Sequence, residues 1–118
     1  MAVENHQVSP LTWHEFERVK MYVGTIVLAQ EFPAARKPAY QLTIDFGPLG
    51  IRKSSAQITQ MYQTQELIGS KVIAVLNFPP KQIANFISEC LVLGSTNQLG
   101  QVRLLRPDEG AQNGERIS

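Results

Sequence analysis

The sequence is poor in the residues that most metal centres and many catalytic sites use. Its 118 residues include one cysteine and two histidines. The single cysteine, Cys90, excludes an intrachain disulfide and a cluster of thiolate ligands. Neither His6 nor His14 has a cysteine or a carboxylate at the spacing typical of metal ligands. We therefore expect no metal centre, and we interpret Cys90, which lies in an apolar run, as a small buried side chain.

Several catalytic and targeting signatures are also missing. The chain has no glycine-rich phosphate loop and no serine flanked by the glycines of a nucleophile elbow. Nothing places Asp45 and Glu66 together as an acid and base pair. The sequence thus favours a binding module over an enzyme, without a cofactor. No apolar run reaches membrane-spanning length, and the start, MAVENHQVSP, lacks the pattern of a signal peptide. We expect a cytoplasmic protein that does not insert into membranes.

Short alternating apolar runs dominate what is present. Residues 40–46 place Tyr40, Leu42, Ile44 and Phe46 on one face, which is the clearest period-two pattern in the chain. Further strands are expected over residues 21–30, 51–54, 71–76, 89–93 and 102–105, with a bend at Gly24 in the first. Strands without a repeating strand–helix alternation predict an all-β fold. The expected architecture is a small β-barrel of the oligonucleotide-binding (OB) type, with short helical turns and terminal extensions.

The ends of the chain carry weaker signals. We expect an N-terminal arm over residues 1–12 and one domain over residues 13–118. Thr12 and Glu15 fit a capping box at the start of a short helix. Trp13 and Phe16 on that helix are interpreted as caps on the core rather than as stacking platforms, because aromatic side chains are usually buried. Near the C-terminus, residues 113–114 form an Asn-Gly turn signal inside a polar tail.

The stretch over residues 71–94 is expected to carry a recognition surface. Residues 71–76 form a β-branched apolar run, which Pro79 and Pro80 bring to an end. Residues 89–93 form the next predicted strand. The connection between the two strands is predicted to be a polar loop containing Lys81, Gln82, Asn85 and Ser88.

Charge gives an ambiguous signal. The net charge of the chain is +1, but residues 36–81 carry six basic and two acidic residues. They predict either a basic patch for an anionic partner or scattered surface lysines. The segment over residues 52–57 has polar groups suited to phosphates and base edges, or to a peptide backbone. A solvated loop is an equal alternative.

Two long segments carry a resemblance to a known family. KSSAQIT at residues 53–59 and NFPPKQIANFISECLVLG at residues 77–94 resemble the CsaA export chaperones. FPAARKPAY at residues 32–40 and IDFGPLGIRKSSAQIT at residues 44–59 agree as well. More broadly, the chain is similar to the tRNA-binding domain of methionyl-tRNA synthetases and EMAP-II-like proteins. The likeness covers nearly everything after Trp13.

The resemblance implies an OB-type homodimer whose terminal segments contribute to the interface. It implies binding of non-native polypeptides or preproteins and of the export machinery, with tRNA as a possible partner. Tyr22 stands where many tRNA-binding relatives have an arginine, and residues 78–80 replace a more basic stretch. Both differences favour a chaperone over the alternative, a protein that binds tRNA or structured RNA.

The candidate contact residues combine the matched positions of the tRNA-binding relatives with nearby basic and apolar groups. Lys53, Ser54, Ser55, Asn77, Lys81 and Ser88 match the recognition motif of those relatives. Phe78, Pro79 and Phe86 are expected to hold apolar side chains of a peptide. The full set of predicted RNA- or peptide-binding residues is Arg36, Lys37, Arg52, Lys53, Ser54, Ser55, Gln57, Asn77, Phe78, Pro79, Lys81, Phe86 and Ser88.

Overall fold

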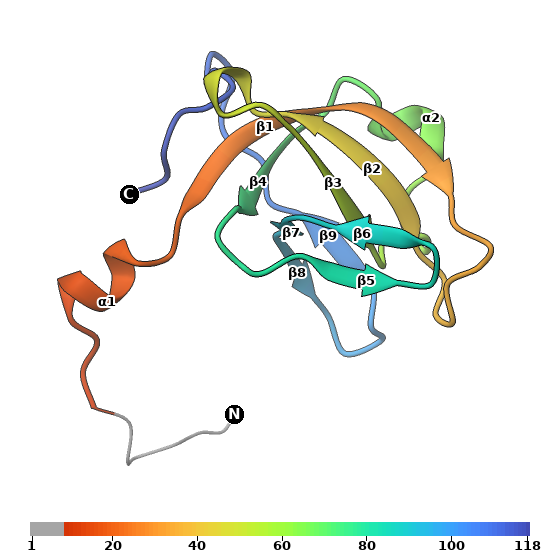
Figure 1. Cartoon of the computed structure of the whole chain (residues 1–118), viewed down its shortest axis with the longest axis horizontal. Coiled ribbons are helices and arrows are strands. Elements are labelled where there is room, and N and C mark those ends of the chain that lie inside the picture. Colours follow the sequence, from red (N-terminus) through yellow and green to blue (C-terminus); the bar gives the residue numbers. More distant parts are fainter. Residues whose placement is uncertain (1–8) are drawn as a thin grey trace.

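Five strands form an antiparallel sheet that curls into a nearly closed barrel (Figure 1). The computed structural model describes residues 9–118, so His6 and most of the predicted arm lie outside it. The strand order is β3-β2-β1-β4-β7. The bounds of these strands are Met21–Glu31 for β1, Tyr40–Asp45 for β2, Ile51–Ala56 for β3, Lys71–Val75 for β4 and Leu91–Val92 for β7. The predicted all-β, OB-type barrel is confirmed.

Two small hairpins and three short helical segments complete the described chain. Strand β5 (Lys81–Ile83) pairs with β6 (Phe86–Ser88), and β8 (Gly94–Thr96) pairs with β9 (Val102–Leu104). Helix α1 covers Trp13–Glu17, α2 covers Thr64–Leu67, and the 3-10 turn η1 covers Gly47–Leu49. Within residues 9–118, no helix has the length and apolar character needed to cross a bilayer.

The barrel core follows the alternation predicted for β2. Leu42, Ile44 and Phe46 are completely buried, while the intervening residues of the strand are partly exposed. Ile26 of β1 and Val72 of β4 are also fully buried in the same cluster. One face of each central strand therefore supplies the core, and the other face is left for contacts outside it.

Gly24 allows β1 to pass close to the core. A Cβ atom at this position would lie 2.6 Å from a ring carbon of Phe46 and 2.7 Å from a methyl carbon of Ile44. The register between β1 and β2 shifts between Ile26 and Leu28, so an irregularity lies shortly after the glycine. A side chain at Gly24 would thus displace core residues at the place where β1 leaves β4 for β2.

The barrel closes along a seam between β3 and residues 88–90. The main-chain N–H of Lys53 donates to the Glu89 carboxylate at 2.9 Å, and the N–H of Glu89 donates to the Lys53 carbonyl at 2.7 Å. The N–H of Ser55 donates to the Ser88 hydroxyl at 3.0 Å. Side-chain groups as well as main-chain groups therefore hydrogen-bond to the outer edge of β3. No further regular strand of the described sheet pairs with that edge.

The C-terminal segment lies along the first half of β1. The N–H of Val23 donates to the Glu115 carbonyl at 3.0 Å, and the N–H of Gly114 donates to the Val23 carbonyl at 2.8 Å. Gly114 has φ of 92°, which a glycine adopts without strain. The segment that the sequence predicts to be a polar tail with a turn is therefore hydrogen-bonded along the first half of β1, where it extends the edge of the sheet.

Three predictions about local structure need correction. The connection predicted as a polar loop contains a hairpin, in which Lys81–Ile83 pairs with Phe86–Ser88, and the strand expected over residues 89–93 is regular only at Leu91–Val92. Strand β8 was not predicted. Trp13 does not cap the core of this chain, because its side chain is 83% exposed and α1 buries no residue. Figure 1 shows α1 standing away from the barrel. The capping box of Thr12 and Glu15 is confirmed.

Candidate binding groove and polar cleft

A groove of about 750 Å³ lies between the end of β3 and the β5–β6 hairpin, and we call it the hairpin groove. Most of its wall is apolar or neutral, and Lys81 is the charged side chain in it. Six of the predicted contact residues line it. The lining residues are Ser55, Gln57, Phe78, Pro79, Pro80, Lys81, Gln82, Ile83, Ser88, Cys90 and Leu91.

The β5–β6 hairpin is held over the barrel by an aromatic contact of Phe86 and by the hydrogen bond from the Ser55 N–H to Ser88 of β6. Phe86 is buried and packs against Phe32 in an edge-to-face arrangement, with ring centroids 5.4 Å apart. Ala39 completes this small cluster. The turn between the strands uses Ala84 with φ of 52°, and the Gln82 side chain donates to the Ala84 carbonyl at 3.1 Å. Phe86 was predicted to hold a peptide side chain, but its burial assigns it to anchoring the hairpin.

Successive side chains of β3 point to opposite sides of the sheet. The polar segment over residues 52–57 is therefore divided between two surfaces. Ser54 is 1% exposed, and its hydroxyl donates to the Cys90 carbonyl at 2.8 Å. Arg52 lies opposite the buried Ile44 and so shares the inward-facing side of the sheet. Lys53 and Ser55 lie on the other side. The Ser54 hydroxyl is therefore part of the seam and is turned away from any ligand on the surface.

A second, more polar depression lies on the outer face of β1, β2 and β3, and we call it the polar cleft. Gln30 is opposite Gln41, and Thr43 is opposite Lys53, so the strand register brings their side chains together. Its volume is about 430 Å³. Its lining residues are Leu28, Gln30, Gln41, Thr43, Lys53, Asn85 and Phe86.

Of these residues, the sequence predicts Lys53 and Phe86 as contacts and places Asn85 on the expected recognition loop. The period-two pattern over residues 40–46 leaves Gln41 and Thr43 on the face of the strand opposite Tyr40, Leu42 and Ile44. That signal would have found them, because outward positions of adjacent strands form one surface. The structure thus offers two different surfaces, one largely apolar and one rich in amide groups, and the β5–β6 hairpin contributes to both.

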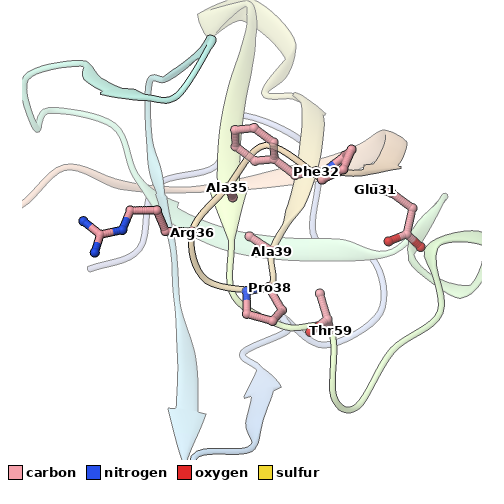
Figure 2. Close-up of a pocket in the computed structure, with 8 residues that line it drawn as sticks. Glu31, Phe32, Ala35, Arg36, Pro38, Ala39 and Thr59 are labelled. Carbon is pink, nitrogen blue, oxygen red and sulfur yellow. The ribbon is translucent and has the colours of Figure 1, made fainter.

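Besides Arg52 and Ser54, three predicted contacts lie outside the groove and the cleft. The Asn77 side chain accepts from the Lys20 N–H at 3.0 Å and donates to the Arg18 carbonyl at 2.7 Å, so it links the end of β4 to the segment before β1. Arg36 and Lys37 are exposed on the loop between β1 and β2. Figure 2 shows the shallow pocket at this loop, with the Arg36 and Glu31 side chains pointing away from each other.

The Cys90 thiol, which lines the hairpin groove, has low reactivity as a nucleophile. Burial raises its pKa to about 11, although the nearby Ser54 hydroxyl and Arg52 act in the opposite direction. A thiol with this pKa is almost entirely protonated at neutral pH and is a poor nucleophile. The groove is therefore suited to binding rather than to covalent chemistry at Cys90.

Comparisons with known proteins agree with this architecture. A family model described as a putative tRNA binding domain matches residues 21–116. The chaperone CsaA of Bacillus anthracis is 46% identical, with a TM-score of 0.88 over 93% of this chain and 100% of that chain. The CsaA chaperone protein of Picrophilus torridus is 50% identical, with a TM-score of 0.85 over 92% of this chain and 100% of that chain.

Similar segments also occur in much longer enzymes. The methionine–tRNA ligase of Bdellovibrio bacteriovorus is 28% identical over 98% of this chain, which spans 17% of that enzyme. Methionine–tRNA ligase 1 of Sorangium cellulosum is 35% identical over 90% of this chain, which spans 15% of that enzyme. The resemblance inferred from the motifs is confirmed. This chain belongs to the putative tRNA-binding domain family and, within it, to the group of the CsaA chaperones.

Proposed function

We propose that this chain is a chaperone that binds non-native polypeptides in the hairpin groove. The observation that carries the proposal is the exposed apolar wall of that groove. Phe78 is 55% exposed and Leu91 is 47% exposed, and Pro79 lies beside Phe78. Apolar side chains of an unfolded chain would remove this surface from water, which favours binding by about 25 cal/mol for each Å² buried. The similarity to two proteins named as CsaA chaperones supports the same assignment.

The groove suits many different clients. Apolar contact is non-directional, so it places weak demands on the exact side chain that is bound. Ser55, Gln57 and Gln82 add hydroxyl and amide groups beside the apolar wall. These groups pair with the amides that every polypeptide backbone carries. A site of this kind distinguishes unfolded from folded chains, because only the former present backbone and apolar side chains together.

We further propose that the chaperone acts as a homodimer in the cytoplasm and delivers its clients for export. Leu11 is 71% exposed and Trp13 is 83% exposed, although both are large apolar side chains on or next to α1. Together with Phe16 they line an apolar depression that also contacts Ser118. A second copy of the chain would cover this surface. Two grooves on one dimer would then bind a long client more tightly than either groove alone.

An aggregation assay tests the chaperone function. Unfolded citrate synthase is diluted into buffer with and without the protein, and light scattering is followed at stoichiometric amounts. The wild-type chain should slow aggregation, and Phe78→Ala should lose most of this effect. Leu99→Ala is the matched control, because Leu99 is a 76% exposed apolar residue on the β8–β9 turn that does not line the groove. Equal activity of the two variants, or no activity of the wild type, would refute the proposal.

Binding of tRNA is a second candidate function, and the polar cleft favours it. Lys53 supplies a cation, and Gln30, Gln41 and Asn85 supply amides of the kind that pair with base edges. The family description points in the same direction. Phosphate neutralisation predicts an affinity that falls steeply with salt, whereas apolar peptide binding does not. Absence of tRNA binding at low salt, or an unchanged affinity in Lys53→Gln, would remove this candidate.

A further inference from the structure

The end of β3 and the residue after it line the hairpin groove, through Ser55 and Gln57. In an antiparallel pair, the main-chain groups of successive residues point alternately toward the partner strand and away from it. The N–H groups of Lys53 and Ser55 both bond to residues of the seam, so these two residues point away from β2. The carbonyl of Ser55 points the same way, because both main-chain groups of a strand residue lie on one edge.

The seam ends at Ser55, and the chain continues through Ala56, the last residue of β3, to Gln57. By the same alternation, the N–H of Gln57 points in the direction of the Ser55 carbonyl. Among residues 9–118, neither the Ser55 carbonyl nor the Gln57 N–H takes part in a hydrogen bond along the seam. Both residues line the hairpin groove. One acceptor and one donor of the main chain therefore meet the groove at strand spacing.

We infer that the groove binds its client in extended form, as a short strand added to the main chain of residues 55–57. This inference rests on the proposed chaperone function and specifies how the site recognises a polypeptide. Main-chain pairing supplies affinity that is independent of sequence, and alternate client side chains would point toward Phe78 and Leu91. Strand addition thus explains how one groove combines a polar edge with an apolar wall.

Charge complementarity narrows the class of client segments. Lys81 is a charged group of the groove lining, and the lining contains no carboxylate. The side chain of Lys81 is exposed at the start of β5. An extended apolar segment next to an acidic residue would therefore be preferred over the same segment next to a basic residue. Because this charge lies on the exposed rim, its effect should weaken as salt is added.

N-methylated peptides test the strand mode directly. The probe is a fluorescein-labelled octapeptide with alternating leucine and serine and one terminal glutamate, measured by anisotropy. One derivative carries N-methyl groups on all odd-numbered amides, and the other carries them on all even-numbered amides. An added strand uses amides of one parity only, so one derivative should bind at least about threefold more weakly than the other. Equal affinities of all three peptides would indicate side-chain contacts alone, and equal losses would indicate a helical ligand; either result overturns the inference.

Substitutions at Gln57 test the protein side of the same contact. Gln57→Pro removes the main-chain donor, and the preceding residue, Ala56, is already in the extended conformation that a following proline requires. It should weaken binding of the octapeptide at least about threefold relative to Gln57→Ala, which keeps the donor. Lys81→Glu should invert the preference between glutamate- and lysine-terminated peptides. If Gln57→Pro does not fold, the peptide derivatives still decide the question on the wild-type chain.

The two proposals fail in different ways. If the unmodified octapeptide binds, and Phe78→Ala weakens it, but both methylated derivatives bind equally, strand addition is wrong and the chaperone function stands. If the octapeptide does not bind and Phe78→Ala suppresses aggregation as well as the wild type, both proposals are wrong.

Discussion

The buried hydroxyl of Ser54 should hold the barrel seam closed, whereas the hydroxyl of the adjacent Ser55 should not. Ser54 is 1% exposed, and its hydroxyl donates to the carbonyl of Cys90, which is itself 6% exposed. Ser54→Ala removes the donor and leaves a buried carbonyl without it, at a cost of about 1–3 kcal/mol. For a chain of this length, that loss corresponds to a fall in Tm of about 4–12 °C.

Urea unfolding at one fixed protein concentration measures this difference. Ser54→Ala should lower the midpoint without changing the dependence of the unfolding free energy on urea, because the surface exposed on unfolding stays the same. Ser55→Ala is the matched control. It leaves the main-chain N–H that bonds to Ser88, and its effect should stay within about 0.5 kcal/mol. Equal midpoints for the two variants would show that the Ser54 bond does not hold the seam.

Three further predictions concern packing and titration. Gly24→Ala should lower the free energy of unfolding by about 1–3 kcal/mol, since its Cβ would lie 2.6 Å from the Phe46 ring; an unchanged urea midpoint would contradict the close approach. Burial raises the pKa of Cys90 to about 11, so stability should be intact below the pKa of the unfolded thiol, about 8.5, and fall toward pH 11. Cys90→Ala should lack this alkaline loss in pH-dependent unfolding. The hydrogen bond from the Thr12 N–H, followed in size by that from the Thr12 hydroxyl, lowers the pKa of the Glu15 carboxyl. The stability that this cap gives to α1 should therefore be complete above the usual pKa of a carboxyl group, and it should be lost as pH falls through the lowered pKa. Thr12→Ala should raise the Glu15 pKa in an NMR titration.

The sequence predicts the barrel well because its core signals are local. The alternation over residues 40–46 predicts the inward face of β2, and Pro79 and Pro80 correctly follow the end of β4. The Thr12–Glu15 capping box is also a local signal, with its two partners three positions apart. Such patterns depend on neighbours within a few residues, which the sequence displays directly.

Features that depend on distant partners are not visible in the same way. Strands β5 and β6 have three residues each, too few to show a period, and their position depends on the contact between Phe32 and Phe86. The C-terminal segment becomes an edge of β1 through partners such as Thr25 and Asn113, which are 88 positions apart. Trp13 was expected to be buried because it is aromatic, but its side chain is 83% exposed. The C-terminal segment does reach α1, where Arg116 donates to the Glu17 carbonyl at 2.7 Å, without covering Trp13.

The candidate site shows the same limit at the level of single residues. Ser54 and Ser55 are chemically identical neighbours, and the sequence alone assigns both to one surface. Strand geometry separates them, since successive side chains of β3 point to opposite sides. The boundary between a structural and a ligand-facing serine is therefore set by the register of β3 against β2, in which Ser54 faces the buried Leu42.

Strand β3 contributes to both proposed binding sites, but it does so through different atoms. Its outward Lys53 side chain lies in the polar cleft, while the main chain of residues 55–57 reaches the hairpin groove. A polypeptide in the groove and a nucleic acid in the cleft would therefore not compete for the same groups on β3. They would still meet at the β5–β6 hairpin, because its first strand lines the groove and its turn, through Asn85, lines the cleft. Phe86 packs that hairpin against Phe32, and Ser88 of β6 accepts a hydrogen bond from the Ser55 N–H of β3. Coupling between the two ligands therefore has three routes, which are the aromatic contact, strand β3 itself and a direct clash at the turn.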